Sequence, residues 1–480
     1  MTESHPQSRR KAAVRALADG IAPEAARWRS RNAYFHAEDA RSLRFLVPAG
    51  LRVLEIGCGT GDLLAALMPK SGVGIDLSAG MIAEARKRHP ELTFIVGDGE
   101  DPEVLTSLGD PFDVIVLADT IGEYEDVVTA FSHLHGLCHR DTRVVIAYHS
   151  PLWWPILKLA EQLGLKKPTP PQNWLSIDDI ASLLELADFE VVAREWRQLV
   201  PRRVLGLGPL INRFIAPLPI IRRFCVRNYV IVRSRRLPPL GRLSATVVIP
   251  CRNECGNIFE AVRRMPAFGS DLELIFVEGH SSDGTADEIR RVIAANPERD
   301  IKFLTQPGRG KGDAVRAGFE AARGDVLIIL DADLTAPPEM LPRFYDALVS
   351  GRGEFINGTR LVYPLETGAM RFLNLIANRI FSLLFTWLIG QRYTDTLCGT
   401  KALTAAHYRR IAAGRPYFGD FDPFGDFDLI LGSARLHLKV CEIPVRYQAR
   451  TYGETQIKRF QHGWLLARMV VFAFFKLKAF

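Results

Sequence analysis

Long uncharged apolar runs are missing from this sequence. A helix that crosses a bilayer needs about 20 consecutive, mostly apolar residues, and no such run is present. Two segments, 371–390 and 464–480, come close but are interrupted by asparagine, arginine or lysine. Amphipathic helices lying on a membrane surface have this pattern, and so do a core helix and a docked C-terminal helix. The sequence alone leaves these two interpretations equally open.

We also expect neither a secretory leader nor a disulfide framework. The first residues, "MTESHPQSRRKAAVRALADG", are basic without an apolar core, so we expect no secretion signal. The 480 residues include only 7 cysteines, an odd number that favours a reducing, cytoplasmic compartment. Cys251 and Cys255 have no matching second pair, so we expect ordinary thiols there.

The composition has no strong bias. Its 48% hydrophobic and 24% charged residues are typical of folded globular proteins, and 480 residues exceed one ordinary core, so we expect two or three domains. The net charge of +7 and the pI near 9.0 favour an anionic partner such as a nucleotide or a phospholipid. The basic residues are scattered without an aromatic-interleaved stripe, so we expect no nucleic acid partner.

The chain divides into two halves with the same plan. Apolar runs alternate with helical patterns along most of it, which favours an α/β fold with largely parallel sheets. This series restarts after "NYVIVRSRR" (228–236), where a Pro/Gly-rich stretch at 237–244 reads as a linker. We therefore predict two tandem Rossmann-like domains, 1–236 and 245–480.

The first half contains a glycine turn between a strand and a helix. In "RVLEIGCGTGDLLAAL" (52–67), Gly57, Gly59 and Gly61 allow a tight turn and let a ligand approach the backbone. A second strand ends in Asp76, at the distance where an acid binds ribose hydroxyls. A third is followed by Asp98. The spacing differs from the dinucleotide turn G-x-G-x-x-G, so a phosphate-binding role is not required.

The order "VLEIGCGTG", "GIDLS", "GD" and "FDVIVLAD" resembles class I S-adenosylmethionine-dependent methyltransferases, roughly over residues 33–236. The resemblance implies S-adenosylmethionine as cofactor. It implies that Glu55 and the residues Gly57, Gly59 and Gly61 line the methionine and ribose portion, that Asp76 holds the ribose hydroxyls, and that Asp98 and Gly99 meet the adenine.

A base for methyl transfer is not identified by these motifs. His149, after the strand "RVVIAY", and His36 are candidates, although a lone histidine is more often a surface or satisfied side chain. The segment "HLHGLCHR" (133–140) has metal-like letters, but on a helix His133 and His135 face different sides. We predict no metal site there.

The second half places polar residues at three strand ends. "ATVVIPCRNE" runs into Arg252 and Glu254, and "LELIFVE" ends at Glu278. "VLIILDADL" ends in Asp331 and Asp333. The carboxyl ends of parallel strands form the ligand-binding edge of an open α/β sheet, so we expect these side chains to lie together.

The two aspartates at the third strand end are typical of a metal site. Two carboxylates one residue apart can share a hard divalent cation, Mg²⁺ or Mn²⁺, which would neutralise a departing diphosphate. Arg309 and Lys311, in a glycine-flanked loop upstream, could donate hydrogen bonds to the same phosphates.

This half resembles glycosyltransferase family 2, with its GT-A nucleotide-sugar fold, over essentially all of 245–480, and is most similar to its polyprenyl-phosphate (dolichol-phosphate mannose synthase-like) branch. The supporting segments are "IPCRNE", "DAD", "NGTR", "DTLCGTKAL", "FGDFDLILGSA" and "EIPVRYQARTYGETQ". The resemblance implies that the nucleotide-sugar is bound by Pro250, Arg252, Glu254, Glu278 and Asp331, and the metal by Asp331 and Asp333. It places Arg309 and Lys311 near the diphosphate, and Arg360, Arg446 and Arg450 at the acceptor. It also places Asp428 where that branch has an acid, with Asp426 as a second candidate catalytic carboxylate, and Asp395 and Thr400 in the "DTLCGT" motif.

Three departures from that branch are visible. The usual "V-D-D-x-S" is "VEGHSSDGT" here, which leaves the nucleotide preference open. The lysine expected after "G-x-(S/T)" is Gln456, with Lys458 nearby, and the trailing transmembrane helices of some members have no counterpart. These last two leave the acceptor open.

The predicted reaction is a single in-line displacement at the anomeric carbon. A lipid phosphate such as polyprenyl phosphate is already anionic and needs no base, and the enzyme would then sit peripherally on the cytoplasmic face of the membrane. A glycan hydroxyl would need Asp428 or Asp426 as general base. Two alternatives remain: the methyltransferase-like half is an inactive binding module, or the chain is a nucleic-acid methyltransferase, which the scattered charge disfavours. The sugar, the nucleotide and the methyl acceptor are not specified by the sequence.

Overall fold

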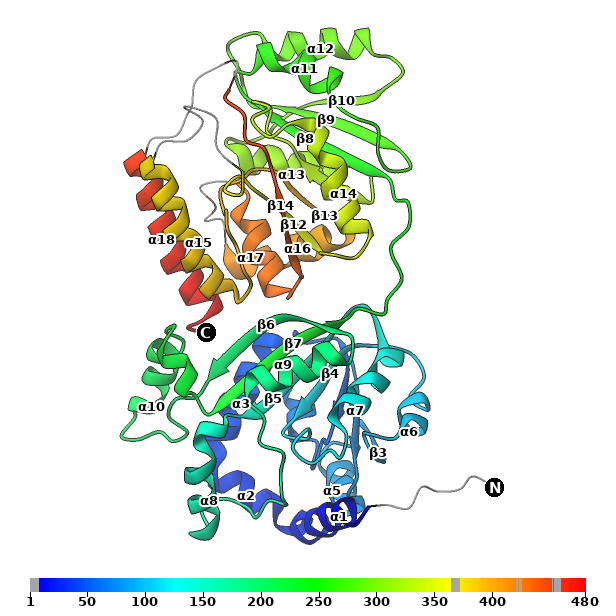
Figure 1. The fold of residues 1–480 in the computed structure, drawn as a ribbon, viewed down its shortest axis with the longest axis vertical. Coiled ribbons are helices and arrows are strands. Elements are labelled where there is room, and N and C mark those ends of the chain that lie inside the picture. Colours follow the sequence, from blue (N-terminus) through cyan, green and yellow to red (C-terminus); the bar gives the residue numbers. More distant parts are fainter. Residues whose placement is uncertain (1–7, 364–371, 420–421, 423–424, 451, 453–458) are drawn as a thin grey trace. The chain divides into compact units, whose positions relative to one another are not determined.

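The computed structural model describes residues 8–363, 372–419, 422, 425–450, 452 and 459–480. The chain forms two compact units, Met1–Leu237 and Pro238–Lys478, which are described separately below (Figure 1). Gln456 and Lys458, which depart from the expected motif, lie outside the described residues.

The first domain is a doubly wound, seven-stranded sheet in the order β3-β2-β1-β4-β5-β7-β6. β1 to β5 are parallel, and β7 runs antiparallel to both β5 and β6. The strands are β1 (Arg52–Ile56), β2 (Ser71–Asp76), β3 (Thr93–Val96), β4 (Phe112–Ala118), β5 (Cys138–His149), β6 (Phe189–Arg197) and β7 (Arg227–Ser234). The helices are α1 (Arg9–Ile21), α2 (Ala25–Arg31), α3 (Ala33–Leu46), α4 (Asp62–Ala66), α5 (Ala79–Arg88), α6 (Pro102–Thr106), α7 (Val127–His133), α8 (Trp154–Gln162), α9 (Ile177–Leu186) and α10 (Leu207–Leu210).

The core of this domain lies on both faces of the sheet. Successive residues of a strand point to opposite faces. Accordingly, Leu54 and Ile115 belong to a cluster completed by α7 and α9, while Val53 and Val114 belong to a second cluster completed by α3 to α5. Strands buried on both faces read as continuous apolar runs, which is why β1 and β4 were visible in the sequence.

The second domain has another seven-stranded sheet, in the order β10-β9-β8-β11-β13-β12-β14. The first four strands in that order are parallel, β13 is antiparallel to β11 and β12, and β12 is parallel to β14. The strands are β8 (Ala245–Cys251), β9 (Leu272–Glu278), β10 (Asp300–Thr305), β11 (Val326–Ile329), β12 (Phe355–Thr359), β13 (Lys401–Thr404) and β14 (Val440–Pro444). The helices are α11 (Cys255–Arg263), α12 (Thr285–Ala295), α13 (Lys311–Ala321), α14 (Leu341–Val349), α15 (Phe372–Ile389), α16 (Ala405–Phe418), α17 (Phe427–Arg435) and α18 (Arg459–Leu477).

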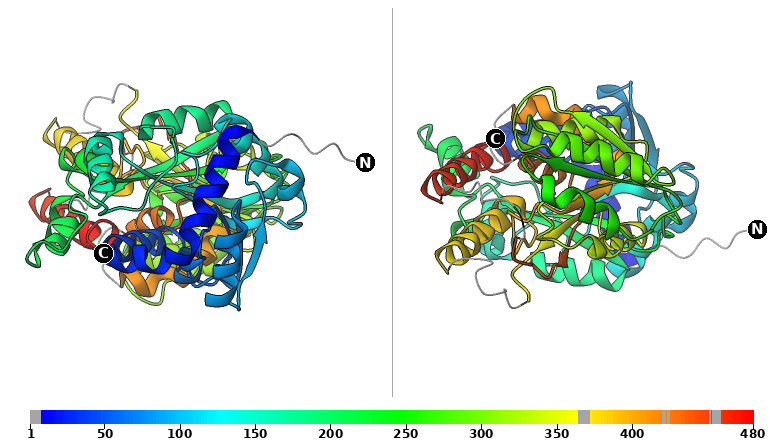
Figure 2. Two further views of the ribbon diagram at one scale, coloured as in Figure 1. Left: turned by 90° about the horizontal axis from the view of Figure 1, so that it is seen from below. Right: turned by 90° about the horizontal axis from the view of Figure 1, so that it is seen from above.

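The α/β fold class in two tandem domains is confirmed. Both sheets are mixed, since each inserts an antiparallel strand beyond its four or five parallel strands. The long helices α15 and α18 pack side by side (Figure 1 and Figure 2). Among the helices that the structure describes, none combines the length and hydropathy needed to cross a membrane.

Candidate active sites

In the first domain the glycine turn follows β1 directly. Gly57, Gly59 and Gly61 all have left-handed φ angles of 77°, 52° and 73°, which glycine adopts without strain. A Cβ on Gly57 would collide with the side chain of Thr120, whereas a Cβ on Gly59 would meet nothing within 4 Å. Gly57 is therefore required for packing, and the space beside Gly59 is open to a ligand.

Asp76, at the end of β2, holds this turn in place. One carboxylate oxygen accepts a hydrogen bond from the Gly59 amide at 2.8 Å and the other accepts one from the Ser78 amide at 2.9 Å. Burial raises the pKa of Asp76 despite these two hydrogen bonds. The structure thus brings the predicted ribose-binding acid and the glycine turn together.

Asp98 and Gly99 follow β3 and are covered by a helix that the motifs did not indicate. Lys11 of α1 forms ion pairs with Asp98 and, at 3.0 Å, with Glu100. The Glu100 amide donates to Asp98 at 2.9 Å, and a Cβ on Gly99 would clash with Ile56. The basic N-terminal segment was the available signal, but its partners lie far along the chain.

A histidine–aspartate pair lies at the ends of β4 and β5. His149 Nδ1 is 2.8 Å from Asp119 Oδ1, and Arg227 forms ion pairs with both Asp119 and Asp39. The ring of His149 stacks on Phe35 with centroids 5.7 Å apart. Since the carboxylate can only accept, this contact favours a proton on Nδ1, and Arg227 Nη1 also lies 3.3 Å from that nitrogen.

Electrostatics fix this pair as an ionised acid beside its histidine. Burial alone would raise the pKa of Asp119, but the Arg227 guanidinium and His149 hold it far below its usual range. Asp119 also has a left-handed φ of 63°, an uncommon backbone state for a residue other than glycine. Burial lowers the pKa of the neighbouring His36 to about 4. His36 is therefore uncharged at neutral pH.

In the second domain, Asp331 and Asp333 come directly after β11. The Leu330 amide still donates to the Val248 carbonyl at 3.0 Å, so the strand pairing extends to the residue before Asp331. Both aspartates therefore lie at the carboxyl edge of the parallel strands, where the sequence predicted them.

Two cations lie against these aspartates. Lys311 Nζ is 2.5 Å from Asp331 Oδ1, and Arg450 Nη2 is 2.6 Å from Asp333 Oδ2. Burial would raise the pKa of Asp331, but the Lys311 ammonium holds it below its usual range. A Cβ on Gly399 would clash with Asp331 and Lys311, so glycine is required there. The site is built around two carboxylates, each paired with a cation.

The predicted nucleoside-contacting residues lie at the adjacent ends of β8 and β9. Glu254 and Glu278 are buried, while Arg252 is exposed and Pro250 is partly buried. Arg450 Nη1 lies 3.3 Å from Glu254 Oε1. Arg450 therefore links the end of β8 with the second aspartate of the β11 end.

The loops after β8 and β9 are tied to each other. The Asn253 amide donates to Ser281 Oγ at 3.0 Å, and the Ser282 amide donates to Asn253 Oδ1 at 2.9 Å. The Ser281 amide also donates to Glu278. The segment "VEGHSSDG" thus holds the loops after β8 and β9 together at the carboxyl edge of the sheet, through the serine residues and Glu278.

The basic glycine loop lies between β10 and α13. The Gly308 amide donates to Asp313 Oδ2 at 2.7 Å, which ties the loop to the first turn of α13. Lys311 begins this helix and points to Asp331, whereas Arg309 is exposed. Of the two predicted phosphate-binding residues, only Lys311 contacts the aspartates.

The predicted acceptor arginines differ in their surroundings. Arg360 forms a bidentate pair with the buried Asp395 at 2.6 and 2.8 Å, and Asn378 of α15 donates to the same carboxylate at 3.0 Å. Arg446 is exposed, with its guanidinium 5.4 Å from the Tyr363 ring centroid. Arg360 is therefore held rigidly, and its pair fastens α15 to the site.

The predicted catalytic acids are both paired with cations. Asp426 lies 2.8 Å from Nζ of the fully buried Lys401, and Asp428 lies 3.3 Å from Arg316 and 3.1 Å from Arg415. Burial lowers the pKa of Lys311, but the charges of Asp331 and then Asp426 raise it above its usual value. Of the two acids, Asp426 is thus the one whose charge acts on Lys311.

A further acid, Asp422, was missed by sequence reasoning. Burial, together with the charges of Asp428 and Asp426, raises its pKa to about 6, while the Gly425 amide donates to it at 2.9 Å. The only signal was the further pair of aspartates, Asp420 and Asp422, upstream of Asp426 in the sequence, which no motif singled out.

Comparison with known proteins identifies both halves. Residues 246–414 match the family described as glycosyl transferase family 2, and residues 20–194 match the one described as methyltransferase domain. The chain joins a methyltransferase domain to a family 2 glycosyltransferase domain.

Relatives of the glycosyltransferase domain include two curated proteins named undecaprenyl-phosphate 4-deoxy-4-formamido-L-arabinose transferase. The one from Edwardsiella ictaluri is 36% identical over 215 residues, which is 44% of this chain and 62% of that protein. The one from Pseudomonas aeruginosa is 30% identical over 226 residues, 44% of this chain and 59% of that protein. The chain therefore spans about three fifths of the length of these relatives.

Solved structures resemble each half only weakly. Glucosyl-3-phosphoglycerate synthase of Mycobacterium tuberculosis is 19% identical with a TM-score of 0.37, covering 50% of this chain and 81% of that one. A S-adenosylmethionine-dependent methyltransferase of Thermotoga maritima, described as a possible histamine N-methyltransferase, is 16% identical with a TM-score of 0.36, covering 46% of this chain and 100% of that one.

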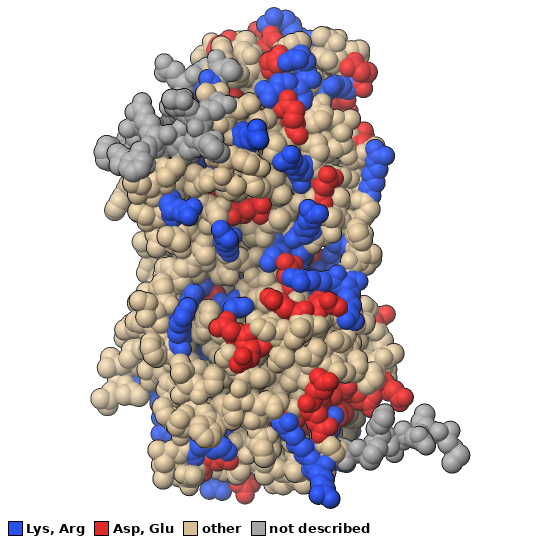
Figure 3. All heavy atoms as spheres, viewed as in Figure 1, with Lys and Arg blue, Asp and Glu red and all other residues tan. Residues whose placement is uncertain are grey.

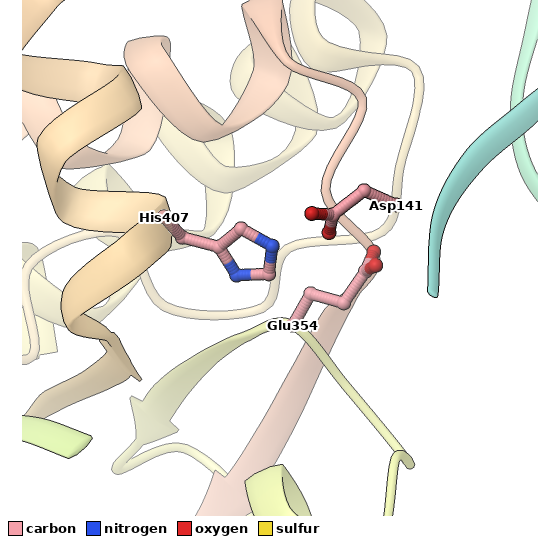
Figure 4. Close-up of side chains that lie close together, drawn as sticks. All are labelled: Asp141, Glu354 and His407. Atoms are coloured by element: carbon pink, nitrogen blue, oxygen red, sulfur yellow. The ribbon is translucent and has the colours of Figure 1, made fainter. Parts of the chain in front are cut away.

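The glycosyltransferase domain also buries His407 and Glu354 near each other (Figure 4). Glu354 accepts a hydrogen bond from the Lys439 amide at 2.7 Å. Asp141, also drawn in Figure 4, is part of the methyltransferase domain and does not count toward a site in this one. Two ligands within one domain fall short of the three or four that protein metal centres use, so we assign no metal there.

Glu55 gives the methyltransferase domain a distinctive pH dependence. Its side chain is 2% exposed, and burial raises its pKa to about 8 from an ordinary value of 4.5. As pH rises, the Glu55 carboxyl group loses its proton at a lower pH in the unfolded chain than in the folded one. The free energy of unfolding should therefore fall as pH rises from about 4.5 to about 8.

We expect Glu55→Gln to remove much of this slope, because the amide does not ionise. Scanning calorimetry of the full chain at several pH values in this window will measure it, with the exposed Glu91→Gln as control. A variant that retains the full wild-type slope would show that Glu55 does not titrate in the window.

Proposed function

We propose that the glycosyltransferase domain transfers a sugar from a nucleoside diphosphate sugar to a lipid phosphate of the polyprenyl-phosphate class. The observation that carries this proposal is the pair Asp331 and Asp333 at the end of β11, with Lys311 and Arg450 against them. The names of the curated relatives, which specify undecaprenyl phosphate, support the acceptor.

The oxygen ligands at this edge fit a hard divalent cation. Asp331 and Asp333 are carboxylates that already pair with cations, and they would hold Mg²⁺ or Mn²⁺. The ion would supply Lewis-acid stabilisation of the diphosphate leaving group. Lys311, and Arg309 once the loop closes on the ligand, would donate to the phosphates, and Glu254 and Glu278 would bound the nucleoside end.

The reaction would be a single in-line displacement. An acceptor phosphate oxygen would attack the anomeric carbon as the bond to the diphosphate breaks, and an anionic phosphate needs no base for this step. Arg360 and Arg446 would orient the acceptor, and Arg450 would do so after releasing Asp333. Positioning of this kind is a major source of rate enhancement.

The surface of α15 and α18 supports an acceptor in a membrane. Apolar side chains are exposed on both helices, with arginine among them; they are Leu375, Ile376, Arg379, Ile380 and Leu383 on α15, and Trp464, Arg468, Val471 and Phe475 on α18. This composition suits a helix pair lying in the bilayer interface. Peripheral membrane association is therefore part of the proposal.

The test is a donor screen with the full chain. UDP-sugars and GDP-sugars would be supplied with Mg²⁺ or Mn²⁺, with and without polyprenyl phosphate, and product formation measured. We expect transfer only with both the metal and the lipid. Transfer to soluble glycans with none to polyprenyl phosphate would instead support the alternative, a hydroxyl acceptor.

Replacing Asp428 with asparagine separates the two acceptor classes. With a lipid phosphate we expect a loss below about 10-fold, caused by loosening Arg316 and Arg415; with a hydroxyl acceptor that relies on this acid the loss should reach about 100-fold or more. The exposed Asp346→Asn is the matched control. Initial rates with each acceptor would be compared, and a loss above 100-fold with polyprenyl phosphate would contradict the base-free mechanism.

We also infer that the methyltransferase domain methylates a hydroxyl group. S-adenosylmethionine would supply the methyl group. The glycine turn, Glu55 and Asp76 would hold its methionine and ribose portions, and Asp98 with Gly99 would meet its adenine. The pair His149–Asp119 supports catalysis: Asp119 orients the imidazole, and Nε2 would take the acceptor proton as the oxygen attacks. The alternative is an inactive module that only binds the cofactor.

A further inference from the structure

The methyltransferase domain exposes an unusual amount of apolar surface between β6 and β7. Leu205 is 98% exposed and Ile220 is 78% exposed, although large aliphatic side chains are normally buried. Other exposed apolar residues of this stretch are Val204, Leu207, Leu210, Phe214, Ile215 and Phe224. We name residues 200–224 the apolar loop.

The apolar loop is ordered by specific bonds. Asn212, itself buried, donates to the Val200 carbonyl at 2.8 Å and to the Tyr34 hydroxyl at 3.0 Å, and it accepts from the Val200 amide at 2.9 Å. Val204 and Leu205 have left-handed φ angles of 31° and 52°, an unfavourable state for such side chains. A defined backbone thus directs apolar groups outward at an energetic cost.

Helix α8 extends this surface. The Trp153 indole donates to the Phe224 carbonyl at 2.9 Å, which joins the start of α8 to the end of the apolar loop. Leu152, Trp154, Ile156, Leu159 and Leu163 are all exposed. A continuous apolar patch of this kind marks an interaction site. Figure 3 shows the α10 part of the patch, where Figure 1 labels the helix, as mostly uncharged.

The charge within the apolar loop has one sign. No acidic residue occurs between Glu195 and Glu254, whereas Arg202, Arg203 and Arg223 are exposed within the apolar loop. Arginine forms bidentate hydrogen bonds with phosphate groups, and basic side chains near apolar anchors bind anionic leaflets with about 1 kcal/mol each. Apolar anchors and an arginine rim together match the interface of a phospholipid bilayer.

We propose that the apolar loop and α8 form a membrane-docking surface of the methyltransferase domain, selective for anionic phospholipid. Leu205, Ile220 and Trp154 insert among the acyl chains near the headgroups, and the arginines contact lipid phosphates. The methyl acceptor is then reached at the membrane. This proposal does not depend on the sugar-transfer proposal.

The test measures binding of the full chain to vesicles of phosphatidylcholine alone and of phosphatidylcholine with phosphatidylglycerol, by co-sedimentation. For wild type we expect at least about 10-fold tighter binding to the anionic vesicles. Leu205→Ser with Ile220→Ser should weaken binding at least about 10-fold, while Leu186→Ser, at a 72% exposed leucine of α9, should not. Arg202→Gln with Arg203→Gln should remove the preference for anionic lipid, and Arg27→Gln with Arg31→Gln on α2 should not.

A local readout separates this surface from α15 and α18. Hydrogen exchange should show residues 202–224 protected when anionic vesicles are added, and no change in residues 177–186 of α9. Unchanged exchange in 202–224, or unchanged binding by Leu205→Ser with Ile220→Ser, would overturn the proposal. Self-association by ultracentrifugation that this double variant abolishes, without lipid binding, would assign the patch to a second copy of the chain instead.

Discussion

Asp331→Asn should reduce sugar transfer about 1,000-fold. Asp331 lies at the end of β11 with Lys311 2.5 Å away, and it is one of two carboxylates proposed to hold the divalent cation. Loss of a charged ligand removes several kcal/mol of stabilisation from the departing diphosphate, and each 1.4 kcal/mol is about tenfold in rate. Initial rates at saturating donor and metal will measure the loss.

The control is Asp346→Asn, an exposed acid of α14 in the same domain, which should retain wild-type rates. Titration of the metal adds a second readout, because Asp333→Asn should raise the metal concentration needed for half-maximal activity. Full activity of Asp331→Asn, or activity of the wild type that persists in a strong chelator, would contradict a metal at this pair.

Asp76→Ala should weaken S-adenosylmethionine binding about 100-fold. The carboxylate holds the Gly59 and Ser78 amides at 2.8 and 2.9 Å and is proposed to accept the ribose hydroxyls. Hydrogen bonds to a charged group contribute about 1.5–3 kcal/mol each, so loss of two corresponds to about 100-fold or more in affinity. Isothermal titration calorimetry with the full chain measures this without knowledge of the methyl acceptor.

Two further variants show whether the loss of affinity arises at the turn after β1. Gly59→Ala leaves Asp76 in place, and its Cβ meets nothing within 4 Å. The left-handed φ of 52° costs alanine about 1–2 kcal/mol, so this variant should be somewhat less stable and should bind the ligand more weakly. Asp110→Ala, at an exposed loop position, should bind like wild type. Equal, wild-type affinity in all three variants would show that the ligand does not occupy the turn after β1.

The positions of candidate site residues were predictable where a polar residue or glycine directly follows a strand. An apolar run precedes each of the residues Gly57, Asp76, Asp331 and Asp333. The run and the residue after it are neighbours in the sequence, so both can be recognised without the fold. A parallel sheet brings such ends to one edge, so their proximity follows from fold class alone.

Partners from distant segments were not predictable in this way. Lys11 reaches Asp98 across 87 residues, and Arg450 reaches Asp333 across 117. In the sequence His149 stands alone, because nothing in "RVVIAYHS" shows that Asp119 lies beside it in the fold. Ion pairs of this kind depend on which helix or loop packs over the edge, and the local pattern does not encode that choice.

The alternation of apolar runs with helical patterns thus establishes two α/β domains, and the motifs at their strand ends establish their families. Only the tertiary structure decides which charges meet and which apolar groups remain exposed. The apolar loop demonstrates the difference: its letters would suit a buried segment, and only folding shows that Leu205 and Ile220 face outward. The physical reason is that backbone periodicity is a local property, whereas burial and ion pairing depend on contacts between residues far apart in the chain.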